Sequence, residues 1–172
     1  MSVPISGISY RNSLAMEKQH QYSVSIKWTG NTGEGTSDYR NYERSHTISS
    51  EHKDDILASS DRPFRGDVSK HNPETLLLSA LSACHMLWYL HLCADAGVIV
   101  VDYVDHAKGT MVQPADRSGH FSEAVLYPLV TVSDSSMVEK ANELHALAHE
   151  KCFIANSVNF PVRHAPVCVV QD

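Results

Sequence analysis

The sequence lacks the charge pattern of a nucleic-acid-binding protein. Its 172 residues contain no run of lysine or arginine, and the formal net charge is −6. Domains that bind nucleic acid concentrate positive charge on one face, so we expect no nucleic-acid partner. The first residues also lack a basic segment followed by an apolar one, which predicts no secretory signal and a cytoplasmic location.

A long uninterrupted apolar run is missing as well. The most apolar stretch, 76–92, contains serine and histidine at Ser79, Ser82, His85 and His91. It falls short of the ~20 apolar residues that cross a bilayer. We therefore expect a buried helix here and no membrane partner.

Cysteine is scarce, with four in the chain: Cys84, Cys93, Cys152 and Cys168. A cytoplasmic domain of this length has enough hydrophobic core to fold without disulfides. Each thiol is therefore expected to be a core residue, a metal ligand or a redox-active group. The choice between these three roles decides the function.

Periodicity and turn residues predict one α+β domain over residues 19–172, preceded by an irregular polar arm at 1–18. Residues 51–70 are expected to form a long loop. The expected strands lie at 22–28, 42–49, 98–112, 122–132 and 162–170. With two intervening helices, the order β-β-α-β-β-α-β favours a mostly antiparallel sheet.

Both predicted helices carry clear boundary signals. The first should begin after Asn72 as N-cap, with Pro73 at its first position, and stop at Gly97. The second should run from about 135 to 151. On the first helix, Cys93 lies nine residues beyond Cys84, about 180° around the axis, so the two thiols cannot be partners.

The remaining residues of the first helix favour a reactive Cys84. Trp88 and His91 share its face. Cys84 lies too deep in the helix for the N-terminal dipole to stabilise a thiolate, so a cation is required. The candidate cations are Arg40, Arg44, Arg62 and Arg65. By contrast, Cys93 and Cys168 are expected to be core residues.

Glu74 lies ten residues before Cys84, about 15 Å along a straight helix. It cannot reach that thiol in its own chain. If both serve one site, Glu74 comes from a second copy, which predicts an obligate dimer.

The second helix brings His145, His149 and Cys152 to one face. Two alternatives stay open from these residues alone. His149 tunes the Cys152 thiol, or the three side chains hold a metal ion such as zinc.

Two cysteine segments carry a wider resemblance. Asn72-Pro-Glu-Thr-Leu76, followed by small and apolar residues up to Cys84, resembles the helix-opening motif and peroxidatic cysteine of the OsmC/Ohr family. Ala148-His-Glu-Lys-Cys152 resembles its second cysteine segment, and Phe64-Arg-Gly-Asp67 is similar to the approach to the helix in OsmC-like proteins. The resemblance covers residues 20–170. Phe153-Ile-Ala-Asn-Ser157 departs from the Pro-containing Ohr sequence and indicates a separate OsmC-like branch.

The resemblance implies an intertwined homodimer with two long central helices and a cysteine-based peroxidase without metal, flavin or haem. The peroxidatic thiol would be Cys84 and the resolving thiol Cys152. Glu74 would pair with the activating arginine. In an Ohr-like arrangement the activating arginine would be Arg44, which is the assignment we prefer. In an OsmC-like arrangement it would be Arg65 or Arg62.

The substrate would be a small organic hydroperoxide, and the reductant a dithiol. We expect Met86, Leu87 and Trp88 to lie beside the organic group of the hydroperoxide. The role would be oxidative or osmotic stress defence. Two rival functions are a Cys/His metal-binding protein and a non-catalytic, stress-associated protein of the same fold.

Overall fold

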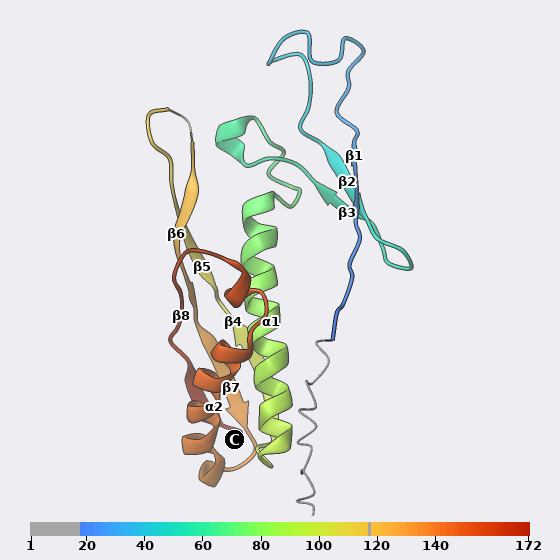
Figure 1. Cartoon of the computed structure of the whole chain (residues 1–172). Helices are drawn as coiled ribbons and strands as arrows, with labels where there is room; N and C mark the ends of the chain where they lie inside the picture. Colours follow the sequence, from blue (N-terminus) through green and yellow to red (C-terminus); the bar gives the residue numbers. More distant parts are fainter. Residues whose placement is uncertain (1–17, 117) are drawn as a thin grey trace, which may run out of the picture.

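The computed structural model describes residues 18–116 and 118–172, so the arm predicted at 1–18 lies outside the described residues except for its last position. A small N-terminal sheet projects beyond the start of a long helix, and the remaining strands and a second helix pack along that helix (Figure 1). The mixture of helices and sheets confirms the α+β prediction.

The N-terminal sheet consists of β1 (Ser25–Trp28), β2 (His46–Ser49) and β3 (Ile56–Ala58), all antiparallel. The prediction of an unbroken loop at 51–70 is wrong, because β3 and the 3₁₀ helix η1 (Arg62–Phe64) lie within it. A strand of three residues is too short to show an alternating pattern, and only its pairing with β2 defines it.

Helix α1 (Pro73–Asp95) has the boundaries that the sequence predicts. The Asn72 side chain accepts a hydrogen bond from the Thr75 N–H at 2.8 Å. The Asn72 N–H donates to Thr75 Oγ1 at 3.3 Å, which completes a capping box. At the other end Gly97 takes a φ of 73°, a left-handed conformation that favours glycine.

α1 is long and apolar enough to cross a membrane by length and composition alone. Its arrangement here is that of a core helix, with one face buried against α2 and the sheet next to it. Five of its residues are buried: Leu81, His85, Tyr89, Leu92 and Cys93.

The strands after α1 form two further sheets. β4 (Val100–Asp105), β7 (Pro128–Val132) and β9 (Val167–Val170) make one, and β5 (Lys108–Val112), β6 (His120–Leu126) and β8 (Val162–His164) make the other. All strand pairings are antiparallel except β6–β8 and β7–β9, which confirms the mostly antiparallel prediction.

Each of the three long strands expected after α1 is in fact two strands. The chain crosses from one sheet to the other after Asp105, after Leu126 and after His164. The crossing at Asp105 is fixed by its carboxylate, which accepts from the Tyr127 N–H at 2.7 Å and from Ser82 Oγ at 2.5 Å. Such long-range bonds leave no local pattern in the sequence.

Helix α2 (Val138–Lys151) follows the 3₁₀ helix η2 (Ser135–Met137), which together match the predicted helix from about 135 to 151. The main core lies between α1, α2 and the β4-β7-β9 sheet. Cys93 is 1% exposed within this core, and Cys168 packs against it. Burial raises the pKa of both thiols, so the prediction that they are core residues is confirmed.

Candidate functional site: a two-cysteine contact between the helices

The two helices bring Cys84 and Cys152 together. Cys84 lies half-buried in the middle of α1, and Cys152 is the buried C-cap of α2. The pKa of the Cys152 thiol is raised to about 11, mainly by burial; the Ala155 N–H opposes this rise, and the nearby Cys84 thiol adds to it. Both thiols are free. The buried Cys152 thiol is therefore protonated, and the Cys84 thiol near it is more accessible.

The turn after α2 holds Cys152 in place. Its sulfur accepts from the Ala155 N–H at 3.4 Å, and its carbonyl accepts from the Asn156 N–H at 3.0 Å. The Asn156 side chain donates to the Glu150 carbonyl at 2.9 Å. These bonds close the chain into the short 3₁₀ helix η3 (Ala155–Ser157). The segment that follows Cys152 is thus a compact cap on α2.

An aromatic corner lies beside the thiol pair. Trp88, one turn after Cys84, makes an edge contact with Phe153 at 5.6 Å between ring centroids. The His91 ring also contacts the Trp88 indole, at 5.8 Å between centroids, and the Lys151 ammonium lies 5.9 Å from the indole centroid. The shared face predicted for Trp88 and His91 is confirmed. Phe153 was not identified from the sequence, where only its position after Cys152 pointed to it.

The structure separates the three residues expected around the organic group. Leu87 and Trp88 line one open cavity of about 240 Å³ together with His91. Met86 lines a different cavity of about 430 Å³, between α1 and the Asp105–Ala107 crossing. Leu87 and Trp88 therefore share a surface with His91, and Met86 faces another one.

Glu74 has an unsatisfied carboxylate. Its Oε2 is buried and, among the residues that the structure describes, has no hydrogen-bond partner. Buried carboxylate oxygens are normally bonded, so a missing donor is expected to come from outside the single chain. Ten residues of helix separate it from Cys84, as the sequence implies.

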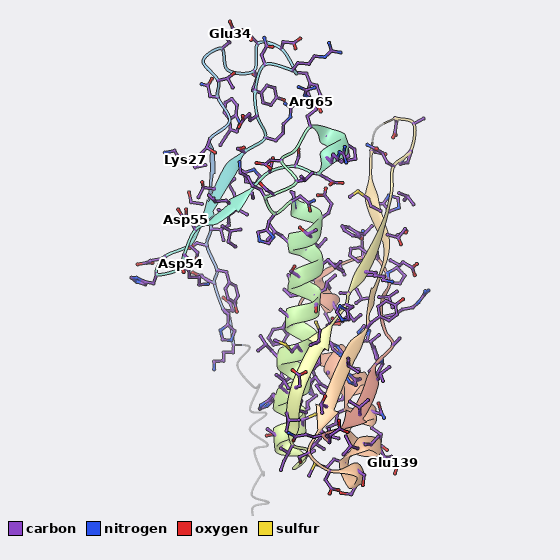
Figure 2. The ribbon with its side chains drawn as sticks, turned by 180° about the vertical axis from the view of Figure 1, so that it is seen from behind. Lys27, Glu34, Asp54, Asp55, Arg65 and Glu139 are labelled. Atoms are coloured by element: carbon purple, nitrogen blue, oxygen red, sulfur yellow. The ribbon has the colours of Figure 1, made fainter. Side chains whose placement is uncertain are left out.

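The two candidate arginines lie together, away from Cys84 in the same chain. Arg44 and Arg65 both line a cavity of about 240 Å³ with the buried Ser45 and Ser59. Figure 2 places Arg65 beside η1, beyond the N-terminal end of α1. Arg44 donates to the carbonyls of Tyr42 and Tyr39, the second at 2.7 Å. Within one chain, neither Arg44 nor Arg65 is positioned to contact Cys84 or Cys152.

Four histidines from α1, α2 and β8 lie together: His85, His145, His149 and His164. His85 Nε2 and His145 Nδ1 are 3.0 Å apart, and His149 and His164 have ring centroids 5.4 Å apart. His145 also stacks on Tyr89 at 3.9 Å. Among residues 18–116 and 118–172, no group of three or more His, Cys, Asp or Glu has the arrangement of a metal site. His145 is hydrogen-bonded to His85, and the rings of both His145 and His149 lie against that of His164.

Comparisons with known proteins identify the family and the fold. The model of the OsmC-like protein family matches residues 66–165. The structure is similar to that of an OsmC-like protein of unknown function from Vibrio cholerae, with 31% identity, a TM-score of 0.77, and coverage of 87% of this chain and 100% of the other. No curated protein sequence matches the chain significantly.

Two more distant structures share the fold. One is an organic hydroperoxide resistance protein from Elizabethkingia anophelis, at 15% identity and a TM-score of 0.65, with 91% of this chain and 100% of that chain covered. The other is an organic hydroperoxide resistance protein from Legionella pneumophila, at 13% identity and a TM-score of 0.61, with 89% and 99% covered. On the family match and the Vibrio cholerae structure, the chain belongs to the OsmC-like family.

Proposed function

We propose that this protein is a cytoplasmic, thiol-dependent peroxidase that reduces organic hydroperoxides in stress defence. The observation that carries the proposal is the proximity of two free thiols from different helices, Cys84 in α1 and Cys152 at the end of α2. Two structural relatives are described as organic hydroperoxide resistance proteins, which supports the same class of substrate. The other two cysteines lie in or against the core and take no part.

The exposure of the two thiols supports different roles. Cys152 has a pKa of about 11 and stays protonated at neutral pH, so it is a poor first nucleophile. Cys84 is more accessible, and beside it lies the corner of Trp88 and Phe153. An apolar corner suits the organic group of a hydroperoxide better than it suits hydrogen peroxide.

The proposed chemistry proceeds in three steps. The Cys84 thiolate attacks the distal peroxide oxygen, the O–O bond breaks, and the alkoxide leaves and takes up a proton as the alcohol. Cys152 sulfur then displaces the hydroxyl of the sulfenic acid, and its own proton leaves with that hydroxyl as water. A dithiol finally reduces the Cys84–Cys152 disulfide by exchange and is itself oxidised to a disulfide.

We propose that the active protein is an intertwined homodimer. In the N-terminal sheet, Ile26, Ile48 and Ile56 pair across the three strands and form one apolar face. Ile26 is 58% exposed and Ile56 39% exposed in the single chain. Exposed apolar patches of this kind mark contact surfaces. A second copy that covers this sheet would also bring an arginine to Cys84 and a donor to Glu74.

Arg44 is the proposed activating residue, and Arg65 is the alternative. Both lie in the N-terminal part of the chain that would be placed on the partner. A guanidinium near Cys84 would favour its thiolate, because an opposite charge within a few ångströms stabilises the charged form. Glu74 would hold that guanidinium in place by a charge-assisted hydrogen bond.

The decisive experiment is a peroxidase assay with a dithiol reductant that compares an alkyl hydroperoxide with hydrogen peroxide. Cys84→Ser should abolish turnover, and Cys152→Ser should permit one oxidation and then stop. Cys168→Ala is the matched control and should retain activity. After hydroperoxide treatment, peptide mapping should find Cys84 bonded to Cys152, whereas a Cys84–Cys93 bond would contradict the assignment.

A further inference from the structure

Arg44 is held more firmly than an ordinary surface arginine. Its Cζ lies 4.2 Å from the ring centroid of Tyr39 and 4.2 Å from that of Tyr42. The two rings are perpendicular, with centroids 6.3 Å apart, so they form a corner around the guanidinium. The main-chain carbonyls of the same two tyrosines accept its hydrogen bonds.

Both walls of this corner are anchored. Tyr42 makes an edge contact with Trp28 of β1 at 5.8 Å, and Trp28 Nε1 donates to the Glu43 carbonyl at 2.8 Å. The Glu43 N–H donates to the Gly30 carbonyl at 2.9 Å. A Cβ at Gly30 would lie 2.0 Å from the Glu43 oxygen, so this close approach of two loop segments requires glycine.

Tyr39 is fixed by a turn. The Asp38 carboxylate accepts from the Arg40 N–H at 2.8 Å, and the Asp38 carbonyl accepts from the Asn41 N–H at 3.1 Å. This turn brings the Tyr39 ring back over Arg44, five residues further along the chain. Tyr39 is 56% exposed, so its ring is held by the arginine and the turn and not by burial in the core.

The corner leaves part of the guanidinium free. Arginine has five N–H donors, and within the described part of the chain Arg44 makes two hydrogen bonds, both to the tyrosine carbonyls. The same side chain lines the cavity shared with Arg65. Arg65 is exposed and has a positive φ of 65°, and no ring among the described residues makes a cation–π contact with it. A pre-positioned guanidinium loses less conformational entropy when it meets an anion.

We propose that Tyr39 and Tyr42 are positioning residues, which fix Arg44 so that its free N–H groups meet the Cys84 thiolate of the second chain. This role rests on the proposed function, in which Arg44 is the activating arginine. The tyrosines act through Arg44 and touch neither thiol nor hydroperoxide. Their ring faces and main-chain carbonyls make the contacts, so phenylalanine should substitute for either.

The first test observes Arg44 itself, in the dimer, by NMR of ¹⁵N-labelled arginine side chains. In the parent protein the Arg44 N–H groups should exchange slowly with solvent. Tyr39→Leu and Tyr42→Leu should each speed this exchange, and Tyr39→Phe should not. Tyr22→Leu, at an exposed tyrosine outside the corner, is the control. Unchanged exchange in both leucine variants would overturn the positioning role, whatever the enzymatic activity.

The second test is the pH dependence of Cys84 alkylation. Removal of one ring should slow Cys84 alkylation at neutral pH roughly two- to fivefold, which is the effect expected from losing one exposed cation–π contact. Arg44→Ala should also slow alkylation. If Arg44→Ala shifts the profile but neither leucine variant does, the positioning role is wrong and the proposed function stands. If Arg44→Ala leaves the profile unchanged, the arginine of the proposed function is wrong, and the role of the tyrosines falls with it.

Discussion

His85 Nε2 and His145 Nδ1 share a hydrogen bond of 3.0 Å that joins α1 to α2. Their ring planes differ by 5°, and both side chains are fully buried. Within the described residues, His85 Nδ1 and His145 Nε2 have no partner. One proton between two buried imidazoles holds this contact, and a second proton would place charge where water does not reach.

The free energy of unfolding should therefore decrease as the pH falls below about 6.5. Burial lowers the pKa of His85 to about 4 and that of His145 to about 3, and His164 shifts in the same direction. Between the unfolded value near 6.5 and these folded values, only the unfolded state binds the protons. Stability is thus fully present above pH 6.5 and is lost as the pH falls, by up to about 1.4 kcal/mol per pH unit for each histidine.

Urea unfolding at several pH values between 7 and 4 measures this slope. His85→Gln removes one of the titrating groups, so its free energy of unfolding should be lower at pH 7 but depend less steeply on pH. His120→Gln, at an exposed histidine on β6, is the control and should keep the parent slope. A parent slope near zero across this range would contradict the prediction.

The activating arginine can be identified from the alkylation rate of Cys84 as a function of pH. Arg44→Ala should raise the pH needed for rapid alkylation, because the thiolate loses its charge partner. Glu74→Ala should act in the same direction but less strongly, with a cost to helix α1 of only ~0.3–1 kcal/mol. If Arg65→Ala shifts the profile and Arg44→Ala does not, the arrangement is OsmC-like and our choice of arginine is wrong.

The dimer proposal makes a sharp prediction about the two faces of the N-terminal sheet. Ile26→Glu places a charge in the row formed with Ile48 and Ile56 and should dissociate the dimer or prevent its assembly. Lys27→Glu changes a charge on the opposite face of the same strand and should leave the dimer intact. Sedimentation equilibrium distinguishes the two. A stable, folded monomer of the parent chain at micromolar concentration would defeat the proposal.

The separation of the two cavities beside α1 predicts which residue governs substrate preference. Trp88→Ala removes the wall that contacts Phe153 and should raise KM for a bulky alkyl hydroperoxide several-fold, with a smaller effect on hydrogen peroxide. Met86→Ala is a matched truncation in the other cavity and should leave this preference unchanged. Equal effects of the two variants would show that the corner does not select the organic group.

Local signals in the sequence predicted α1 well. Asn72, Pro73 and Gly97 are boundary residues whose effect depends on nearby backbone, so they act in any fold. Helical spacing likewise predicted that Trp88 and His91 share a face of α1 and that Cys93 lies on the face opposite Cys84. The cysteine motifs predicted the family, because they lie in the two segments that the fold brings together.

Other features were decided only by tertiary structure. The crossing at Asp105 depends on its carboxylate, whose partners Ser82 and Tyr127 are distant in the chain. The same is true of the contact of His85 with His145, sixty residues apart, and of the position of His164 against both His145 and His149. A sequence records the spacing of side chains along one helix, but which helix they meet depends on how the whole chain packs.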